Sequence, residues 1–182
     1  MTKIVNTPLT DEVIIDLHAG DRVLLNGIIY TGRDAAHKRL VEMIDRGEEL
    51  PIELKGQVIY YVGPCPAKPG AVIGSAGPTT SGRMDAYANR LLDKGLKGMI
   101  GKGSRNKNVI DSIVKNNAVY FGAIGGAGAL LAEAIKEAEL LAFPELGPEA
   151  VYKFMITDFP VTVIIDSQGK DLYKIGRELY KK

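Results

Sequence analysis

Strand-like stretches alternate with helix-like stretches through most of the chain, and this order constrains the fold more than any other feature. The strand-like stretches are short and rich in branched apolar residues, and they cover 22–30, 57–63, 97–103 and 118–124. Apolar residues at helical spacing mark the stretches 34–47, 84–95, 104–117 and 125–141. This alternation predicts an α/β fold with a partly parallel sheet.

The two ends of the chain add further elements. Thr10, which two acidic residues follow, is expected to cap a short helix over 13–19. Near the other end, 150–159 and 161–175 have strand character, and SQGK is assigned to a tight turn between the last strands. These features predict a C-terminal antiparallel hairpin. Because no linker-like stretch interrupts the pattern, we expect one domain over residues 1–182.

Composition excludes several classes of function. The net charge of +1 gives no bulk electrostatic signal for nucleic acid. No apolar run is long enough to span a bilayer, and the first residues do not resemble a signal peptide, so we expect a cytoplasmic protein without a membrane partner. Cys65 is the only cysteine. One cysteine cannot form an internal disulfide or supply a cysteine-rich metal or iron–sulfur site by itself.

The stretch GPTTSGRM (77–84) ends a long Gly/Pro-rich loop and nearly matches a nucleotide-binding P-loop. Gly77 and Gly82 have the P-loop spacing, but Arg83 replaces the lysine and Met84 replaces the hydroxyl residue. Its hydroxyls, its arginine and the helix that follows favour an anion site. The alternative is a glycine-rich turn with a helix cap.

Other polar residues also follow strand-like stretches. Arg33 lies at a strand end, where α/β sheets commonly place ligands, and Asp34 is expected to cap the next helix. His37 has the residue type to titrate near neutrality, although a partly exposed helical histidine is an equal alternative. Lys102 stands between two glycines, either as a cation held near a ligand or as an exposed turn residue.

Two more features invite a functional reading and receive a plainer one. GGAGAL (125–130) follows a strand and precedes a helix, as a dinucleotide-binding loop does, but Leu131 replaces the required small residue. We interpret it as close strand–helix packing. Cys65 lies in the Gly/Pro loop, where a lone cysteine is more often inert than reactive.

Several of these segments together resemble one family. The matching segments are GIIYTGRDAAHKR (27–39), YVGPCPAKPG (61–70), GSAGPTTSGRMDAY (74–87), GLKGMIGKG (95–103) and DFPVTVIIDSQGKDLY (158–173). They are similar to the β subunit, or C-terminal domain, of class I iron–sulfur fumarate hydratases and L-tartrate dehydratases. The resemblance covers nearly the whole chain, and it implies a swivelling β/β/α domain distantly similar to the mobile domain of aconitase.

The resemblance also implies chemistry, namely the reversible loss of water from a 2-hydroxy dicarboxylic acid. In that family a [4Fe–4S] cluster sits on three cysteines of the α part, and its open iron acts as a Lewis acid on the leaving hydroxyl. Cys65 does not match a ligand position of that cluster. The chain is therefore expected to be active only with a separate α subunit, and the family suggests a two-plus-two assembly.

The resemblance assigns roles to five residues. Arg33 and Arg83 would hold the two substrate carboxylates with their guanidinium groups. Lys102 would stabilise charge that builds on a carboxylate during proton loss. Thr79 is the family's candidate proton-abstracting group, although it could instead orient the substrate or relay a proton. Thr80 would bind a carboxylate or cap the helix, and His37 receives no chemical step.

Three hypotheses follow about function. The first is a fumarate hydratase β subunit, a hydro-lyase that converts fumarate to L-malate and back. The second is an L(+)-tartrate dehydratase β subunit with the same machinery, since the two substrates differ by one hydroxyl. The third belongs to another class, a non-catalytic module that binds an anion or a nucleotide through the P-loop-like stretch.

Overall fold

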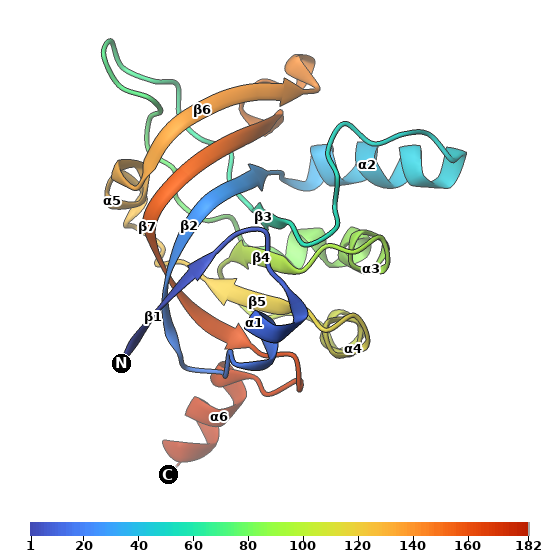
Figure 1. Ribbon diagram of the computed structural model, residues 1–182, viewed down its shortest axis with the longest axis vertical. Coiled ribbons are helices and arrows are strands. Elements are labelled where there is room, and N and C mark those ends of the chain that lie inside the picture. Colours follow the sequence, from blue (N-terminus) through green and yellow to red (C-terminus); the bar gives the residue numbers. More distant parts are fainter. Residues whose placement is uncertain (182) are drawn as a thin grey trace.

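The computed structural model describes residues 1–181, and its elements alternate much as the sequence predicts (Figure 1). The strands are β1 (Thr2–Asn6), β2 (Arg22–Thr31), β3 (Val58–Tyr60), β4 (Gly98–Gly101), β5 (Val119–Gly122), β6 (Ile135–Ala142) and β7 (Val151–Ile165). The α-helices are α1 (Asp11–Ile15), α2 (Asp34–Arg46), α3 (Asp85–Asp93), α4 (Lys107–Lys115), α5 (Gly128–Glu133) and α6 (Leu172–Leu179). Two 3₁₀ turns complete the list, η1 (Ser81–Met84) and η2 (Pro144–Glu149).

Five strands close into a small barrel-like sheet. β2, β3, β4 and β5 pair in parallel in that order, which confirms the α/β fold and the partly parallel sheet. The long strand β7 pairs antiparallel with both β5 and β2 and so closes the ring. β1 extends the sheet beside β2, and β6 extends it beside β7.

The central strands are apolar throughout because both of their faces are buried. One core contains Val58, Tyr60 and Val62 together with side chains of β2, β4, β5 and β7. Ile59 and Tyr61, which point the opposite way, belong to a second core formed with α2, α3 and α4. In Figure 1 these three helices lie along one side of β3, β4 and β5.

The helix ends largely follow their capping signals. The hydroxyl of Thr10 accepts a hydrogen bond from the Val13 backbone N–H at the start of α1, as predicted. Asn106 caps α4 in the same way through the Val109 N–H. Gly47 ends α2 in the left-handed conformation, with φ of 69°. Among the described residues, none of the helices is both long and apolar enough to cross a bilayer.

Two predictions near the C-terminus are wrong. The predicted helix 125–141 is only the short α5 followed by strand β6, because backbone pairing with β7 overrides the helical spacing there. The predicted strand 161–175 ends at Ile165, and α6 begins after Asp171, whose carboxylate accepts from the Tyr173 N–H. Residues 150–159 and 161–165 thus form one continuous strand, and the antiparallel hairpin pairs β6 with β7.

The parallel strands place four loops at one edge of the barrel. β2, β3, β4 and β5 run in the same direction, so their carboxyl ends lie together. Arg33 follows β2, Gly63 follows β3, Lys102 follows β4, and the turn 123–127 follows β5. This edge is where an open α/β sheet places its ligands, and it carries the sequence-predicted site residues.

Candidate functional site

The segment 79–81 lies alongside the end of β4 and brings three predicted residues together. Thr80 and Lys102 form a parallel β-bridge. The Ser81 N–H donates to the Lys102 carbonyl at 2.8 Å, and the Lys102 N–H donates to the Thr79 carbonyl at 3.3 Å. The Thr79 N–H in turn donates to the Tyr61 carbonyl at 2.7 Å. Thr79 is half-buried, whereas Thr80 and Lys102 are exposed.

A glycine and a buried hydroxyl pair fix this segment. A Cβ at Gly101 would lie 2.0 Å from the Ser81 Oγ, so only glycine permits so close an approach. The Ser81 hydroxyl donates to the Tyr120 hydroxyl at 2.8 Å, and the Tyr120 hydroxyl donates to the Gly103 carbonyl at 2.8 Å. Burial raises the pKa of Tyr120, so its phenol stays protonated. The Tyr120 hydroxyl therefore connects the segment that follows β3, through Ser81, to the loop after β4, through Gly103.

Arg105 is a buried cation that the sequence did not reveal. Its side chain is fully buried, and its Nε donates to the Asp85 carboxylate at 2.6 Å. The guanidinium also lies over the rings of Tyr61 and Tyr120, at 5.3 Å and 5.1 Å from their centroids. Asp85 accepts a further hydrogen bond from the Asn106 N–H at 2.7 Å. This pair fastens the start of α3, which directly follows η1, to the loop before α4.

Arg33 stands at the N-cap position of α2 and is held on two sides. Its Nη2 lies 3.0 Å from the Glu149 carboxylate, and each side chain is 24% exposed. A Cβ at Gly63 would lie 2.9 Å from its Nη1, so the guanidinium packs against the loop that follows β3. The Nε of Arg33 is buried without a hydrogen-bond partner among the described residues. Arg33 therefore keeps donors beyond the one that Glu149 uses.

Arg83 pairs with Asp34, and this corrects the predicted cap. The Arg83 Nη2 lies 2.8 Å and 3.0 Å from the two carboxylate oxygens of Asp34. The cap position belongs to Arg33, and Asp34 is the first residue inside α2. Burial alone would raise the pKa of Asp34, but a backbone N–H and then the nearby arginines outweigh it, so the pKa is lowered. Because Asp34 follows Arg33 directly in the sequence, this ion pair brings the Arg83 guanidinium close to the start of α2, where Arg33 also lies.

Lys102 differs from the two arginines in its surroundings. Within residues 1–181 it forms no ion pair, whereas Arg33 and Arg83 each pair with a carboxylate. Its side chain passes close to Gly125: a Cβ at Gly125 would lie 3.5 Å from the Lys102 Cδ. A hollow of about 370 Å³ adjoins it, lined also by Ile124 and Tyr173. Among the described residues, the Lys102 ammonium on the β4 loop is thus a positive charge without a carboxylate partner.

The GGAGAL stretch packs against the Gly/Pro loop rather than against a strand. The Ala76 N–H donates to the Gly128 carbonyl at 3.0 Å. A Cβ at Gly128 would lie 2.4 Å from the Ser75 Oγ and 2.9 Å from the Gly77 N, so glycine is needed for this approach. The predicted strand–helix packing is therefore wrong, because the close partner of Gly128 is loop 75–77 and not a strand.

His37 is fully buried, which corrects the predicted partly exposed histidine. Its Nδ1 donates to the Arg33 carbonyl at 2.8 Å, and its ring meets the Tyr61 ring edge-on at 5.2 Å. Burial, aided by the Arg105 charge, lowers its pKa to about 4. His37 is thus neutral near neutral pH, and it supports the backbone of Arg33 from below.

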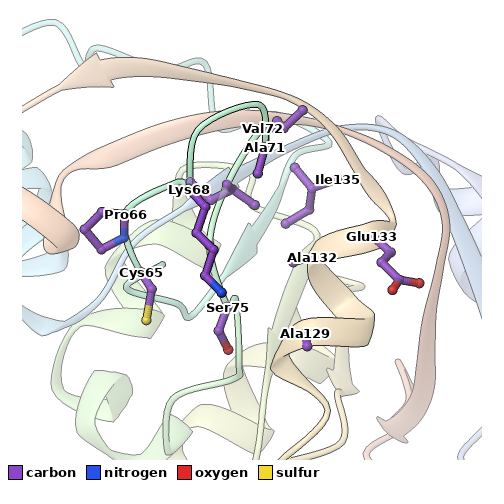
Figure 2. Close-up of a pocket in the computed structure, with 12 residues that line it drawn as sticks. Cys65, Pro66, Lys68, Ala71, Val72, Ser75, Ala129, Ala132, Glu133 and Ile135 are labelled. Carbon is purple, nitrogen blue, oxygen red and sulfur yellow. The ribbon is translucent and has the colours of Figure 1, made fainter.

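Cys65 lines a groove beside the site. The groove has a volume of about 510 Å³ and lies between the loop 65–75 and the segment formed by α5 and the start of β6. Figure 2 shows the Lys68 side chain extending toward Ser75, with α5 on the opposite wall. None of the five predicted site residues lines this groove. Cys65 is exposed and free.

The residue types that bind metals form no cluster in the described part of the chain. Within residues 1–181, no group of three or more histidine, cysteine, aspartate or glutamate side chains is placed to hold a metal ion. The site at the strand ends instead offers guanidinium, ammonium and hydroxyl groups. Such groups bind and orient a carboxylate-bearing molecule.

Comparisons with known proteins identify a family for this chain. A family model described as fumarase C-terminus matches residues 2–176. Fumarate hydratase 2 of Leishmania major is 46% identical over 156 residues, which are 85% of this chain and 28% of that protein. The anaerobic class I fumarate hydratase of Escherichia coli is 44% identical over 155 residues, which are 84% of this chain and 28% of that protein. The chain thus spans little more than a quarter of the length of these hydratases.

A shorter relative matches almost end to end. The putative L(+)-tartrate dehydratase subunit beta of Methanocaldococcus jannaschii is 37% identical over 181 residues, which are 96% of this chain and 93% of that protein. The family model and this relative together cover nearly all of the chain. The chain therefore belongs to the fumarase C-terminus family.

Proposed function

We propose that this chain is the β subunit of a class I fumarate hydratase, a hydro-lyase that interconverts fumarate and L-malate. One observation carries the proposal: Arg33, Arg83 and Lys102 stand with two threonine hydroxyls on neighbouring loops at one edge of the barrel. A dicarboxylate bears two negative charges, and such a set of cations suits both of its ends. The names of the fumarate hydratase relatives support the choice of substrate.

In this proposal the two arginines bind the substrate carboxylates. Each arginine uses one nitrogen on an internal carboxylate, Glu149 or Asp34, and keeps other donors for a ligand. Binding at both ends of the substrate fixes the position, relative to the protein, of the carbon from which the proton is removed. The internal pairs orient the guanidinium groups before the substrate arrives.

Thr79 and Lys102 are proposed to serve the proton transfer. Backbone hydrogen bonds join their two segments directly. In dehydration of malate, a proton leaves the carbon next to the hydroxyl-bearing carbon, and charge builds on the adjoining carboxylate. The Lys102 ammonium stabilises that charge. The Thr79 oxygen accepts the proton as an alkoxide, which the positive charges of Lys102 and Arg83 stabilise, and becomes the neutral hydroxyl.

The [4Fe–4S] cluster expected from the resemblance does not fit this chain's own side chains. Cys65 is a single exposed cysteine on a groove that none of the five site residues lines. We therefore assign the cluster, and with it the leaving hydroxyl, to a separate α subunit. The subunit name of the tartrate dehydratase relative supports such a partner.

Further properties are proposed with this function. We propose that residues 1–182 act as one domain of the swivelling β/β/α type, in the cytoplasm, within a two-plus-two hetero-oligomer. The closed barrel with helices on one side supports the domain type. A swivelling motion would bring the strand-end loops toward a cluster on the partner subunit.

L(+)-tartrate is the second candidate substrate, and a specific observation favours it. The tartrate dehydratase relative covers nearly the same length as this chain, whereas the fumarate hydratases are much longer. Tartrate carries one more hydroxyl than malate, so the two reactions need the same carboxylate-binding groups. A pocket that hydrogen-bonds the extra hydroxyl would separate the two substrates.

Nucleotide binding by GPTTSGRM is disfavoured by the use of its backbone. A P-loop surrounds phosphate with free N–H groups. Here the N–H groups of Thr79, Ser81 and Arg83 donate to carbonyls of Tyr61, Lys102 and Thr80, respectively. Calorimetry of the chain with ATP and GTP should therefore detect no binding.

The test is an anaerobic assay of the chain with and without its α partner. We expect fumarate hydration by the complex only, and we expect malate to be dehydrated faster than L-tartrate. Full activity of this chain alone would refute the assignment of the cluster to a partner. A faster reaction with L-tartrate would move the proposal to the second candidate.

A further inference from the structure

Glu149 contacts the arginine site from a distant part of the sequence. It ends η2, the connection between β6 and β7. Its Oε1 lies 3.0 Å from the Arg33 Nη2, and its Oε2 accepts from the Ala35 backbone N–H at 3.4 Å. One carboxylate therefore joins the Arg33 side chain to the first turn of the helix that Arg33 caps.

This contact restricts a side chain that would otherwise be mobile. A free arginine samples many rotamers, and fixing them costs affinity when a ligand binds. Gly63 packs against the Arg33 Nη1 on one side, and Glu149 holds the Nη2 on another. The Arg33 Nε keeps its donor unpaired among the described residues. The Arg33 guanidinium is thus held in one orientation and still has N–H donors available for a ligand.

We infer that Glu149 is a positioning residue, which orients Arg33 for a substrate carboxylate and so lowers the KM. The inference rests on the proposed function, because it deepens the role given there to Arg33. It differs from a competing role, in which Glu149 would occupy the place of the substrate carboxylate. A competing carboxylate would raise the KM, so its removal would lower it.

The same connection provides a matched control. Glu145, also in η2, pairs with Arg39 of α2 at 2.8 Å. That pair joins the same two elements, but its side chains are about half exposed and Arg39 is not among the predicted site residues. Loss of the Glu145 pair therefore reports the general cost of loosening η2 from α2. Only the Glu149 pair acts on Arg33.

The experiment compares Glu149→Gln, Glu149→Asp, Glu145→Gln and Arg33→Ala in the complex with the α subunit. We expect Glu149→Gln to raise the KM for malate roughly ten- to hundredfold, with kcat changed far less. This range corresponds to loss of the charge-assisted hydrogen bond between Arg33 and the substrate carboxylate. Glu149→Asp should recover part of the KM. Glu145→Gln should leave the KM within about twofold, and both glutamine variants should have similar melting temperatures.

The outcomes separate the inference from the function on which it rests. If Arg33→Ala raises the KM and Glu149→Gln leaves it unchanged or lowers it, only the positioning role is overturned. Equal KM changes in Glu149→Gln and Glu145→Gln would also overturn it, since both would then report docking of η2. An unchanged KM in Arg33→Ala would overturn the proposed site itself. In the double variant Arg33→Ala with Glu149→Gln, the KM should match that of Arg33→Ala alone.

Discussion

Replacing Arg105 with methionine should destabilise the protein strongly. The Arg105 side chain is fully buried, and that of Asp85 is only 10% exposed. The change would leave the Asp85 carboxylate with the Asn106 N–H as its remaining short contact. Removing one partner of a buried ion pair typically costs about 3–5 kcal/mol, because the remaining charge is uncompensated. Lost contacts with the Tyr61 and Tyr120 rings add to this cost.

Urea unfolding monitored by circular dichroism measures the effect as a change in the free energy of unfolding. The matched control is Arg90→Met, which breaks an exposed pair with Asp45 in which both side chains are about half exposed. Exposed pairs contribute about 0–1 kcal/mol, so the control should stay near wild type. The double variant Asp85→Asn with Arg105→Met should regain much of the loss, since it leaves no unpaired charge.

The result that would refute this reasoning is a loss of less than about 1 kcal/mol in Arg105→Met. The pair would then behave like an exposed one, and Arg105 would not fasten the loop before α4 to α3. A double variant as unstable as Arg105→Met alone would also count against the argument. In that case packing, and not the unpaired charge, would set the cost.

Three further predictions concern the supports of the site. Gly101→Ala places a Cβ 2.0 Å from the Ser81 Oγ, so we expect a loss of roughly 1–3 kcal/mol by urea unfolding, whereas Gly176→Ala, which meets nothing within 4 Å, should cost little. The pKa of His37 is lowered from 6.5 to about 4, so the folded state binds fewer protons than the unfolded state in that window. Stability should therefore fall by up to roughly 3 kcal/mol as the pH drops from about 6.5 to 4, and an equally steep slope in His37→Asn would contradict this. Thr79→Val should lower kcat by about 10²-fold or more while Thr79→Ser retains most of it, and equal rates for the two variants would exclude a role for the hydroxyl.

The central part of the fold was predictable from the sequence because its signals are local. Buried parallel strands read as continuous apolar runs, and amphipathic spacing marks the helices between them. The segment 135–142 was mispredicted because its alanine, glutamate and leucine residues favour helix, and its pairing with β7 is a tertiary contact. Residues 172–175 show the opposite error, because they were predicted as strand but begin helix α6 after the cap at Asp171.

The site was predictable only in part. The strand-end rule brings Lys102 and Thr79 to one edge, because β3 and β4 are parallel neighbours. The rule has no information on Glu149, which reaches Arg33 through a connection far along the chain. Arg105 gives no signal either, since arginines are usually exposed. Of these three missed features, the burial of His37 alone had a sequence signal, because His37 lies at helical spacing before the apolar Leu40 and Ile44.

The most direct test of the central claim is the KM for malate of Arg83→Ala in the complex with the α subunit. Arg90→Ala is the matched control, because Arg90 is about as exposed as Arg83 and also pairs with an aspartate. We expect Arg83→Ala to raise the KM at least about tenfold, as loss of a carboxylate-binding guanidinium would, and Arg90→Ala to leave it near wild type. An unchanged KM and kcat in Arg83→Ala would contradict a dicarboxylate site at this edge of the barrel.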